Sequence, residues 1–334
     1  QERKVESAFF REDFNRIDPD DLGYIEFASR ALEEYQTDFY RLLKPSASGR
    51  RLKIVCDFGY SAIGSMFPSM LARYGVDAIN TNSFNEARLA PRSEEDVARH
   101  TDALKQIVGT LGYDLGVLFL HEGEKMVLVD DKGRILDGNT LLALVCALVA
   151  ETKTDPTVAL TVTASSRLEE YLTERGVKVV RTKADTRSLM ATSFKEKVLI
   201  AGDADGGLIF PEFHAGFDAM FGLLALVTML QTSGRSLSSV LEDLPHFHLA
   251  YERVRCPWEV KGSVMRMLAE ETRGEPNVEL LDGIKLHDNG QWVLVIPDAV
   301  EPVFHVHAES ANDDTSRDLV ARYSARILEL QEKR

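Results

Sequence analysis

The stretch that decides the fold begins at residue 52 and is Leu52-Lys53-Ile54-Val55-Cys56-Asp57, followed by Phe58-Gly59-Tyr60-Ser61. The first six residues are a short apolar run of the kind that forms a buried strand, and the glycine after them favours a turn. A helical pattern then covers residues 66–74 and stops at Gly75, and residues 76–80 are a second apolar run. A strand, a helix and a second strand in this order predict an α/β unit.

The same alternation continues along the chain. Ser93 and Asp96 form a capping-box pattern, which predicts a helix from residue 94 to about 111. Further strands are expected at 114–119, 125–129, 158–162, 177–181 and 198–201, with helices at 140–150, 166–175, 186–194 and 216–232. Strands separated by helices of this length indicate mostly parallel pairing. We therefore predict two tandem α/β/α domains with mixed, mostly parallel sheets, at residues 45–150 and 151–251.

The two ends of the chain have different patterns. Asn289-Gly290 is a strong hairpin signal among four short apolar runs, so we predict a smaller C-terminal α+β domain at residues 252–334. Residues 1–44 are expected to be a lead-in segment with a helix at 30–43, ended by the linker-like stretch Pro45-Ser46-Ala47-Ser48-Gly49.

The composition excludes several classes of protein. The chain has 334 residues, with 39 Lys and Arg against 53 Asp and Glu, for a net charge of −14. So acidic a surface repels nucleic-acid phosphates and anionic lipids, and we expect neither nucleic acid nor membrane as a partner. Three widely separated cysteines indicate no disulfide framework and no zinc cluster, which favours a cytoplasmic location. The first residue is Gln1, so we expect the chain to be part of something longer.

Two segments carry a family resemblance. Residues 114–117 (Asp-Leu-Gly-Val) and 129–139 (Val-Asp-Asp-Lys-Gly-Arg-Ile-Leu-Asp-Gly-Asn) resemble the α-D-phosphohexomutase family, the phosphomannomutases and phosphoglucomutases. The resemblance implies four domains, of which this chain would contain the second to the fourth. The first domain, which carries the family's phosphoserine nucleophile, would be absent.

The resemblance places a metal loop at residues 120–125. The family's motif is D-G-D-G-D-R, and here the aligned residues are Leu120-His121-Glu122-Gly123-Glu124-Lys125. Glu122 and Glu124 keep a negative charge, but Leu120 cannot bind a metal, and the longer Glu side chains suit near-octahedral Mg²⁺ poorly. We therefore expect no cofactor, or Mg²⁺ held only weakly at Glu122 and Glu124. Lys125 is a candidate substrate-binding residue.

A sugar-binding loop is implied at residues 202–207. The family's motif is G-E-x-S-G-H, and here it is Gly202-Asp203-Ala204-Asp205-Gly206-Gly207. The glycines predict that the loop keeps its shape, and Asp203 and Asp205 are the candidates for binding sugar hydroxyls. Lys183 and Arg187 resemble a basic turn of the family's third domain and are candidates for contacting an anion.

The implied phosphate loop is altered most. The family's motif is R-P-S-G-T-E-P-K-x-R, and the aligned stretch is Ile296-Pro297-Asp298-Ala299-Val300-Glu301-Pro302-Val303-Phe304-His305. The gripping Arg is replaced by Ile296 and a hydroxyl donor by Asp298, while His305 replaces the second Arg. Phosphate binding needs donors and positive charge, so Asp298 and His305 are expected to be remnants of the site.

A second stretch imitates the family's nucleophile motif. Thr163-Ala164-Ser165-Ser166 begins like T-A-S-H-N, but no His-Asn follows. Its position between a predicted strand and a predicted helix favours a helix cap by Ser165 or Ser166 instead.

The remaining sequence suggests a subfamily. Residues 6–14 and 256–266 resemble the mutase-like C-terminal module of bacterial mannose-1-phosphate guanylyltransferases. This resemblance implies a catalytically degenerate, structural or regulatory module in nucleotide-sugar synthesis, with no catalytic residues of its own and with a sugar phosphate as a candidate ligand. The implied partner is a nucleotidyltransferase domain in the same parent chain. The alternative is an active phosphomannomutase or phosphoglucomutase whose serine domain is missing, and whether the chain is an enzyme and whether it forms an oligomer stay open.

Overall fold

A computed structural model describes residues 2–13, 16–26, 28 and 30–333. The chain divides into two compact units, one up to Tyr40 and one from Arg41 onward. The first unit holds the helix α1 (Glu2–Phe10) and the single turn η1 (Pro19–Asp21), and α2 (Ala31–Leu42) begins in it. The helix expected at 30–43 is therefore confirmed as α2.

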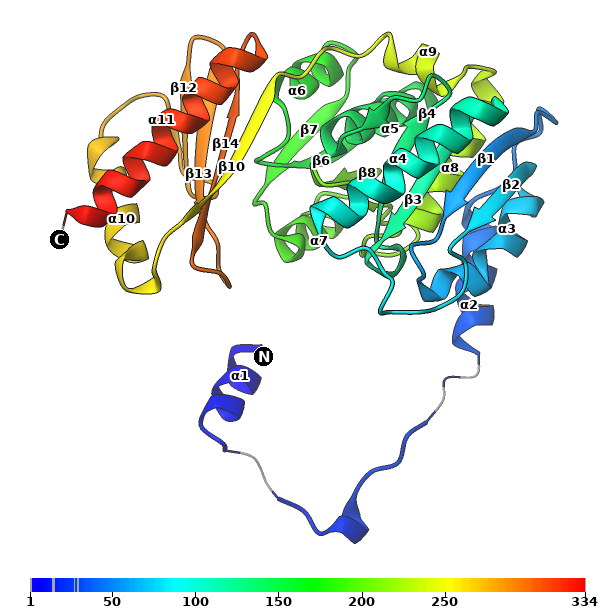
Figure 1. Cartoon of the computed structure of the whole chain (residues 1–334), viewed down its shortest axis with the longest axis horizontal. Coiled ribbons are helices and arrows are strands. Elements are labelled where there is room, and N and C mark those ends of the chain that lie inside the picture. Colours follow the sequence, from blue (N-terminus) through cyan, green and yellow to red (C-terminus); the bar gives the residue numbers. More distant parts are fainter. Residues whose placement is uncertain (1, 14–15, 27, 29, 334) are drawn as a thin grey trace. The chain divides into compact units, whose positions relative to one another are not determined.

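The first sheet of the second unit has five strands (Figure 1). They are β1 (Leu52–Asp57), β2 (Val76–Thr81), β3 (Leu115–Leu120), β4 (Lys125–Asp130) and β5 (Ile135–Leu136), in the order β2-β1-β3-β4-β5. The pairs β1–β2 and β1–β3 are parallel, and β4 and β5 add antiparallel strands at one edge. The helical segments of this part are η2 (Ala62–Ser65), α3 (Phe67–Arg73), α4 (Glu94–Leu111) and η3 (His121–Gly123).

The second sheet repeats this plan with four strands. They are β6 (Thr157–Thr161), β7 (Lys178–Thr182), β8 (Ile200–Gly202) and β9 (Leu208–Ile209), in the order β7-β6-β8-β9. Again two pairs are parallel and the last strand is antiparallel. The helices are α5 (Gly138–Thr152), α6 (Ser166–Thr173), α7 (Thr186–Lys195), α8 (Ala219–Ser233) and α9 (Leu237–Leu241). The expected mixed α/β fold with mostly parallel sheets is confirmed.

The third sheet is antiparallel throughout. Its strands are β10 (Leu249–Arg255), β11 (Val278–Glu279), β12 (Ile284–Asp288), β13 (Gln291–Pro297) and β14 (Val303–Glu309), in the order β10-β14-β13-β12-β11. Its helices are α10 (Trp258–Glu271) and α11 (Asp313–Glu332). The turn between β12 and β13 is made by Asn289 and Gly290, both with positive φ (47° and 81°), as the Asn-Gly signal predicts.

Helix starts follow local capping chemistry. The predicted capping box is present: the Ser93 hydroxyl accepts the backbone N–H of Asp96, and the Asp96 carboxylate accepts that of Ser93. The helix α8 begins at Ala219 rather than at the predicted residue 216. The reason is that Asp218 caps it, since its carboxylate accepts the N–H of Phe221 at 2.8 Å.

The two faces of the third sheet have different neighbours. On one face Val306 and Phe304 pack with α10 and α11 in an apolar core. On the other face Trp292, Leu294 and Ile296 pack against Val162, at the carboxyl end of β6. This second face therefore joins the third sheet to the second and carries the side chains of the site described next. Among the described residues, no helix has the length and apolar character needed to cross a bilayer.

Candidate functional site

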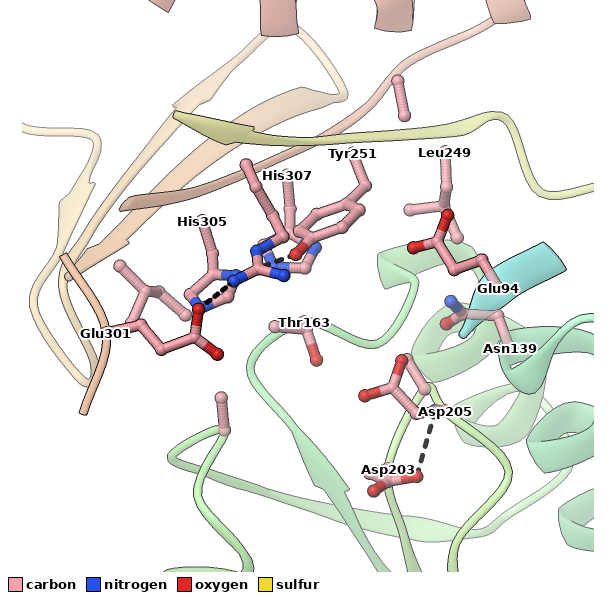
Figure 2. Close-up of a pocket in the computed structure, with 15 residues that line it drawn as sticks. Glu94, Asn139, Thr163, Asp203, Asp205, Leu249, Tyr251, Glu301, His305 and His307 are labelled. Carbon is pink, nitrogen blue, oxygen red and sulfur yellow. Dashed lines mark hydrogen bonds and ion pairs between the residues drawn. The ribbon is translucent and has the colours of Figure 1, made fainter. Parts of the chain in front are cut away.

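A pocket of about 610 Å³ lies where loops of the first two sheets meet the third sheet (Figure 2). Its lining comes from the third sheet and from segments that belong to the first two sheets: Glu94, Asn139, Thr163, Ala184, Asp203, Ala204, Asp205, Leu249, Ala250, Tyr251, Arg253, Ile296, Glu301, His305 and His307. Carboxyl ends of parallel strands are the usual position of ligand sites in α/β sheets, and Thr163 and Ala184 follow two such strands, β6 and β7. Of the predicted site residues, Asp203, Asp205 and His305 are brought together here, and their substrate-binding role stays a prediction.

The loop of residues 203–207 forms one wall and is fixed from within. Oδ1 of Asp203 accepts the backbone N–H groups of Asp205 at 3.0 Å and Gly207 at 2.8 Å. Two glycines allow the close packing around the loop: a Cβ on Gly138 would lie 1.8 Å from the carbonyl oxygen of Ala204, and Gly206 has φ of 88°. Contacts that only glycine permits therefore help to fix the shape of this loop, and its likeness to the family's loop stays a prediction.

The ammonium group of Lys125 forms ion pairs with the carboxylates of this wall. Its Nζ lies 2.7 Å from Oδ2 of Asp203 and 3.9 Å from Oδ2 of Asp205. The pair with Asp203 is largely buried, with the two side chains 19% and 10% exposed. The ammonium therefore holds the two carboxylates in place and neutralises part of their charge.

Asp205 is the more open of the two carboxylates. Its side chain is 81% exposed to solvent, yet it sits inside the walls of the pocket. The surrounding protein raises the pKa of the Asp205 carboxyl, and the charge of Asp203 adds to this effect, while Lys125 opposes it. Asp205 is thus a carboxyl group that a ligand can reach.

The opposite wall is one face of the third sheet. In the antiparallel pair β10–β14, Tyr251 is opposite His307 and Arg253 is opposite His305, so all four side chains lie on the same face. Figure 2 shows Tyr251, His305 and His307 on this wall, with Asp203 and Asp205 on the facing loop. Burial lowers the pKa of His307 to about 4, with the neighbouring His305 and Lys285 adding to the effect, so His307 is neutral at pH 7.

The hairpin between β13 and β14 supplies two carboxylates to this wall. Oδ1 of Asp298 accepts the N–H groups of Val300 and Glu301, both at 2.7 Å, and Oδ2 lies 2.8 Å from Nε2 of His305. Burial opposes ionisation, but these hydrogen bonds lower the pKa of Asp298 to about 2. The Lys261 ammonium donates to the backbone carbonyls of Asp298 and Glu301, which fixes the hairpin.

In the structure, the implied phosphate loop carries less unpaired negative charge than its sequence indicates. Ile296 lines the pocket where the resemblance places a gripping Arg, as expected. The negative charge of Glu301, however, is paired with Arg253 from the neighbouring part of the sheet. Sequence reasoning missed Arg253 and Tyr251 because they belong to β10, about 50 residues before the hairpin, and only strand pairing brings them there.

The implied metal loop does not fit Mg²⁺. Leu120 ends β3 and offers no side-chain oxygen, and Oε2 of Glu122 accepts the backbone N–H of Ala62 at 3.0 Å. Glu124 is exposed, and the turn is made by positive φ at Glu122 (58°) and Gly123 (93°). Within residues 2–13, 16–26, 28 and 30–333, no group of three or more His, Cys, Asp or Glu could hold a metal ion.

Two other predicted features lie away from the pocket wall. Lys183 and Arg187 are exposed, and the residue of their turn that lines the pocket is Ala184. Ser165 is buried and caps α6, because its Oγ accepts the N–H of Arg167 at 3.1 Å. The interpretation of this serine as a helix cap is confirmed.

Comparisons with known proteins find similarity to the phosphohexomutases. Residues 137–247 match the model of the phosphoglucomutase/phosphomannomutase alpha/beta/alpha domain III. Over 327 residues the chain is 28% identical to a probable phosphoglucosamine mutase of Methanopyrus kandleri, covering 96% of this chain and 70% of that relative. A phosphoglucosamine mutase of Methanocaldococcus jannaschii is 25% identical, with 96% of this chain and 72% of the relative covered.

Solved structures share the fold. A phosphoglucomutase/phosphomannomutase family protein of Burkholderia thailandensis superposes with a TM-score of 0.79 at 17% identity, covering 98% of this chain and 69% of that one. The Aspergillus fumigatus N-acetylphosphoglucosamine mutase, solved in complex with GlcNAc-6P and magnesium, gives a TM-score of 0.62 at 14% identity, covering 90% of this chain and 65% of that one.

One prediction is wrong. We expected a catalytically degenerate structural or regulatory module fused to a nucleotidyltransferase, but relatives aligned over 96% of the chain are named phosphoglucosamine mutases, and they give no sign of fusion or degeneracy. The error arose because each motif was judged along the chain alone. Strand pairing can bring distant residues to a loop, as it brings Arg253 beside Glu301.

The match of residues 137–247 and the alignments over nearly the whole chain lead to one conclusion. Residues 137–247 match the phosphoglucomutase/phosphomannomutase alpha/beta/alpha domain III, and the chain as a whole is similar in sequence to phosphoglucosamine mutases and in fold to phosphohexomutase structures.

Proposed function

We propose that this protein acts as a phosphohexose mutase and that its first candidate substrate is a phosphorylated glucosamine. One observation carries the proposal: loops from all three sheets converge on a single pocket of about 610 Å³, in a chain whose relatives are named phosphoglucosamine mutases over 96% of its length. A pocket of this volume is in the range of small-molecule sites. The alternative considered from the sequence, an active mutase, is thereby the better supported of the two.

The polar groups of the pocket suit a hydroxylated, positively charged sugar. Asp205 and Glu94 present carboxylates, and Asn139 and Thr163 present an amide and a hydroxyl. Carboxylates accept hydrogen bonds from hydroxyl groups and attract an ammonium group such as that of glucosamine. This composition favours a hexosamine over a hexose at the same site.

Arg253 is the group best placed to meet the phosphate of the ligand. Its contact with Glu301 uses one of the five N–H donors of a guanidinium, which leaves others to reach an anion in the pocket. A charge-assisted hydrogen bond of this kind contributes about 1.5–3 kcal/mol. The sugar would then lie between Arg253 and the loop that carries Asp205.

The reaction moves a phosphoryl group from one sugar hydroxyl oxygen to another. The phosphorus–oxygen bond at the first oxygen breaks, a bond to the second oxygen forms, and the proton of the second hydroxyl ends on the first. The chain's own part is to bind the ring, orient both hydroxyl groups and hold a proton during transfer. Because the loop at 120–125 does not fit Mg²⁺, no step is assigned to that ion.

The test is turnover in the full natural protein that carries this chain. Glucosamine 6-phosphate, glucose 1-phosphate and mannose 1-phosphate are each incubated with it, and ³¹P NMR follows the appearance of a second phosphomonoester signal. We expect interconversion, fastest with glucosamine 6-phosphate. The variant Asp205→Asn should lower kcat/KM about tenfold, whereas Asp288→Asn, on the β12–β13 hairpin, should leave it unchanged. Absence of interconversion with all three sugars would remove the proposal.

A further inference from the structure

We propose that Tyr251 is a catalytic acid–base residue of the pocket, which exchanges a proton with a hydroxyl group of the bound sugar, and that His305 and Asp298 position it. The inference rests on the proposed function, because it needs a sugar in the pocket. It assigns a chemical task to three side chains of the third sheet, none of which the sequence indicated as a group.

The three side chains form a continuous chain of hydrogen bonds. Oδ2 of Asp298 lies 2.8 Å from Nε2 of His305, and Nδ1 of the same imidazole lies 2.8 Å from the hydroxyl of Tyr251. Asp298 begins the turn between β13 and β14, His305 is on β14, and Tyr251 is on β10. The chain therefore runs across two paired strands and ends on a phenol that lines the pocket.

The direction of these hydrogen bonds follows from the state of Asp298. Its carboxyl is ionised well below neutral pH, so it can only accept a hydrogen bond. Nε2 of His305 must then carry a hydrogen, and in the neutral imidazole Nδ1 is an acceptor. Tyr251 therefore donates its O–H to Nδ1, which turns the lone pairs of the phenol oxygen toward other groups.

The end of the chain is open to a ligand. Tyr251 is 49% exposed, and its oxygen can accept a hydrogen bond from a hydroxyl group in the pocket. Burial raises the pKa of Tyr251, with Asp205 adding to the effect and Arg253 opposing it, so the phenol does not ionise by itself at neutral pH. The oxygen of Tyr251 can accept a proton from the sugar hydroxyl only while the phenol gives its own proton to Nδ1 of His305.

The charged and titratable groups around His305 and Tyr251 come from every neighbouring element. They are Arg253 on β10, His307 on β14, Asp298 and Glu301 on the hairpin, Asp205 on the facing loop, and Glu94 at the start of α4. Asp298 is in direct contact with the imidazole and would offset the positive charge that forms there. The proton is therefore held on the imidazole of His305, two hydrogen bonds away from the sugar.

Atoms and electrons balance in the proposed step. The sugar hydroxyl gives its proton to the oxygen of Tyr251, and Tyr251 gives its proton to Nδ1 of His305. The sugar oxygen forms a bond to phosphorus of a phosphate monoester donor, either a phosphorylated side chain or a sugar bisphosphate. The donor's phosphorus–oxygen bond breaks with its electron pair on the donor oxygen, and that oxygen takes up a proton from solvent water. When phosphoryl transfer runs in the other direction, the proton returns along the same chain.

A purely structural role is the competing explanation. The ring of Tyr251 stacks on His305 and lies 4.8 Å from His307 between ring centroids, which could be its whole purpose. Tyr251→Phe separates the two explanations, because phenylalanine keeps the ring and removes only the hydroxyl. Tyr74→Phe is the matched control, since that tyrosine also donates a hydrogen bond, at 2.6 Å to the carbonyl of Leu43, but does not line the pocket.

The first experiment measures steady-state kinetics of the full natural protein with glucosamine 6-phosphate. Tyr251→Phe should lower kcat by about 100-fold or more, as expected for loss of an acid–base group, and should leave KM within about threefold. Asp298→Asn should lower kcat in the same direction and change the pH profile of kcat, whereas Tyr74→Phe should change neither. An unchanged kcat in Tyr251→Phe would overturn the inference while leaving the proposed function intact.

The second experiment does not depend on turnover. Imidazole ¹⁵N shifts of His305 report which ring nitrogen carries the hydrogen, and glucosamine 6-phosphate is added as the probe. A sugar hydroxyl that donates to Tyr251 strengthens the hydrogen bond from Tyr251 to Nδ1, so it should shift the Nδ1 resonance of the neutral Nε2–H tautomer in the wild type and not in Tyr251→Phe. If His305 responds while no interconversion occurs, the proposed function fails and the relay stands. If His305 does not respond in the wild type, the inference fails whatever the turnover.

Discussion

Two polar clusters lie on the same face of the third sheet, a few residues apart, and they differ in what they leave free. At one end the Glu309 carboxylate is buried, at 1% exposure, and accepts hydrogen bonds from the Ser165 hydroxyl, the Ser166 N–H and the Trp292 indole. At the other end the chain from Asp298 through His305 ends on Tyr251, which is half exposed in the pocket.

The two clusters therefore suit different roles, one in stabilising the fold and the other in contacting a ligand. Every partner of Glu309 belongs to the protein, so this cluster joins β14 to the start of α6 and has no capacity left for a ligand. The chain that ends on Tyr251 has an acceptor directed to the pocket. Breaking the first cluster should therefore cost stability, and breaking the second should cost chemistry.

The largest effect on stability is expected from Glu309→Leu. The substitution leaves the donors of Ser165, Ser166 and Trp292 buried without partners, at about 1–3 kcal/mol for each group. We expect the free energy of unfolding to fall by about 3 kcal/mol or more in urea denaturation. Tyr251→Phe should lower the free energy of unfolding by less than about 0.5 kcal/mol. Equal losses of stability in the two variants would contradict the proposed difference between the clusters.

A smaller loss is expected from Lys125→Met at the facing wall. Removal of the ammonium leaves the buried carboxylate of Asp203 without its ion pair, at 2.7 Å in the wild type. We expect a loss of about 2–3 kcal/mol in the free energy of unfolding, because an unpaired buried charge is strongly unfavourable. Lys132→Met is the control, because it removes an exposed ion pair with Glu242, and it should lower the free energy of unfolding by less than about 1 kcal/mol. A similar loss of stability in both variants would argue against a special role of Lys125.

Acid should weaken the pocket wall through His307. The pKa of His307 is about 4 in the folded protein, against an ordinary value of 6.5, so between these pH values the unfolded chain binds more protons. Stability from this residue is therefore fully present above pH 6.5 and is lost as the pH falls toward 4, by up to about 2 kcal/mol after allowance for partial exposure. His307→Gln should flatten the pH dependence of the unfolding midpoint in this window, and an unchanged slope would contradict the assignment.

The smallest effect is expected at residues 120–125. Glu122 accepts one backbone N–H, that of Ala62, so Glu122→Gln should lower the free energy of unfolding by about 1 kcal/mol or less. Addition or removal of Mg²⁺ should shift the melting temperature of the wild type and of this variant equally. A stabilisation by Mg²⁺ that Glu122→Gln abolishes would show that this loop binds the metal after all.

Local sequence signals predicted much of the fold and part of the site. The Ser93–Asp96 box and the Asn289-Gly290 turn determine their own geometry within four residues, and both are present as expected. The motif at residues 202–207 likewise placed Asp203 and Asp205 on one loop, and both line the pocket, while their binding of a sugar stays a prediction.

Long-range pairings could not be predicted in the same way. Tyr251 meets His305 across 54 residues of sequence, and Ser165 meets Glu309 across 144. No local pattern encodes these contacts, because they depend on the order of strands in the third sheet and on its docking against α6. The wrong expectation of a degenerate module has the same origin: it judged the hairpin without Arg253, which strand pairing brings beside Glu301.

The central claim, that this pocket binds a sugar phosphate, is tested most directly by calorimetric titration with glucosamine 6-phosphate. The wild type is compared with two variants. Arg253→Met removes the arginine that lines the pocket and pairs with Glu301. Arg326→Met is the control, because it removes an Arg–Glu pair between α11 and α10 that lies outside this pocket. We predict that Arg253→Met weakens binding about 10- to 100-fold, the equivalent of one lost charged hydrogen bond, and that Arg326→Met leaves the affinity unchanged. Equal affinity of all three proteins, or no binding by the wild type, would contradict the account.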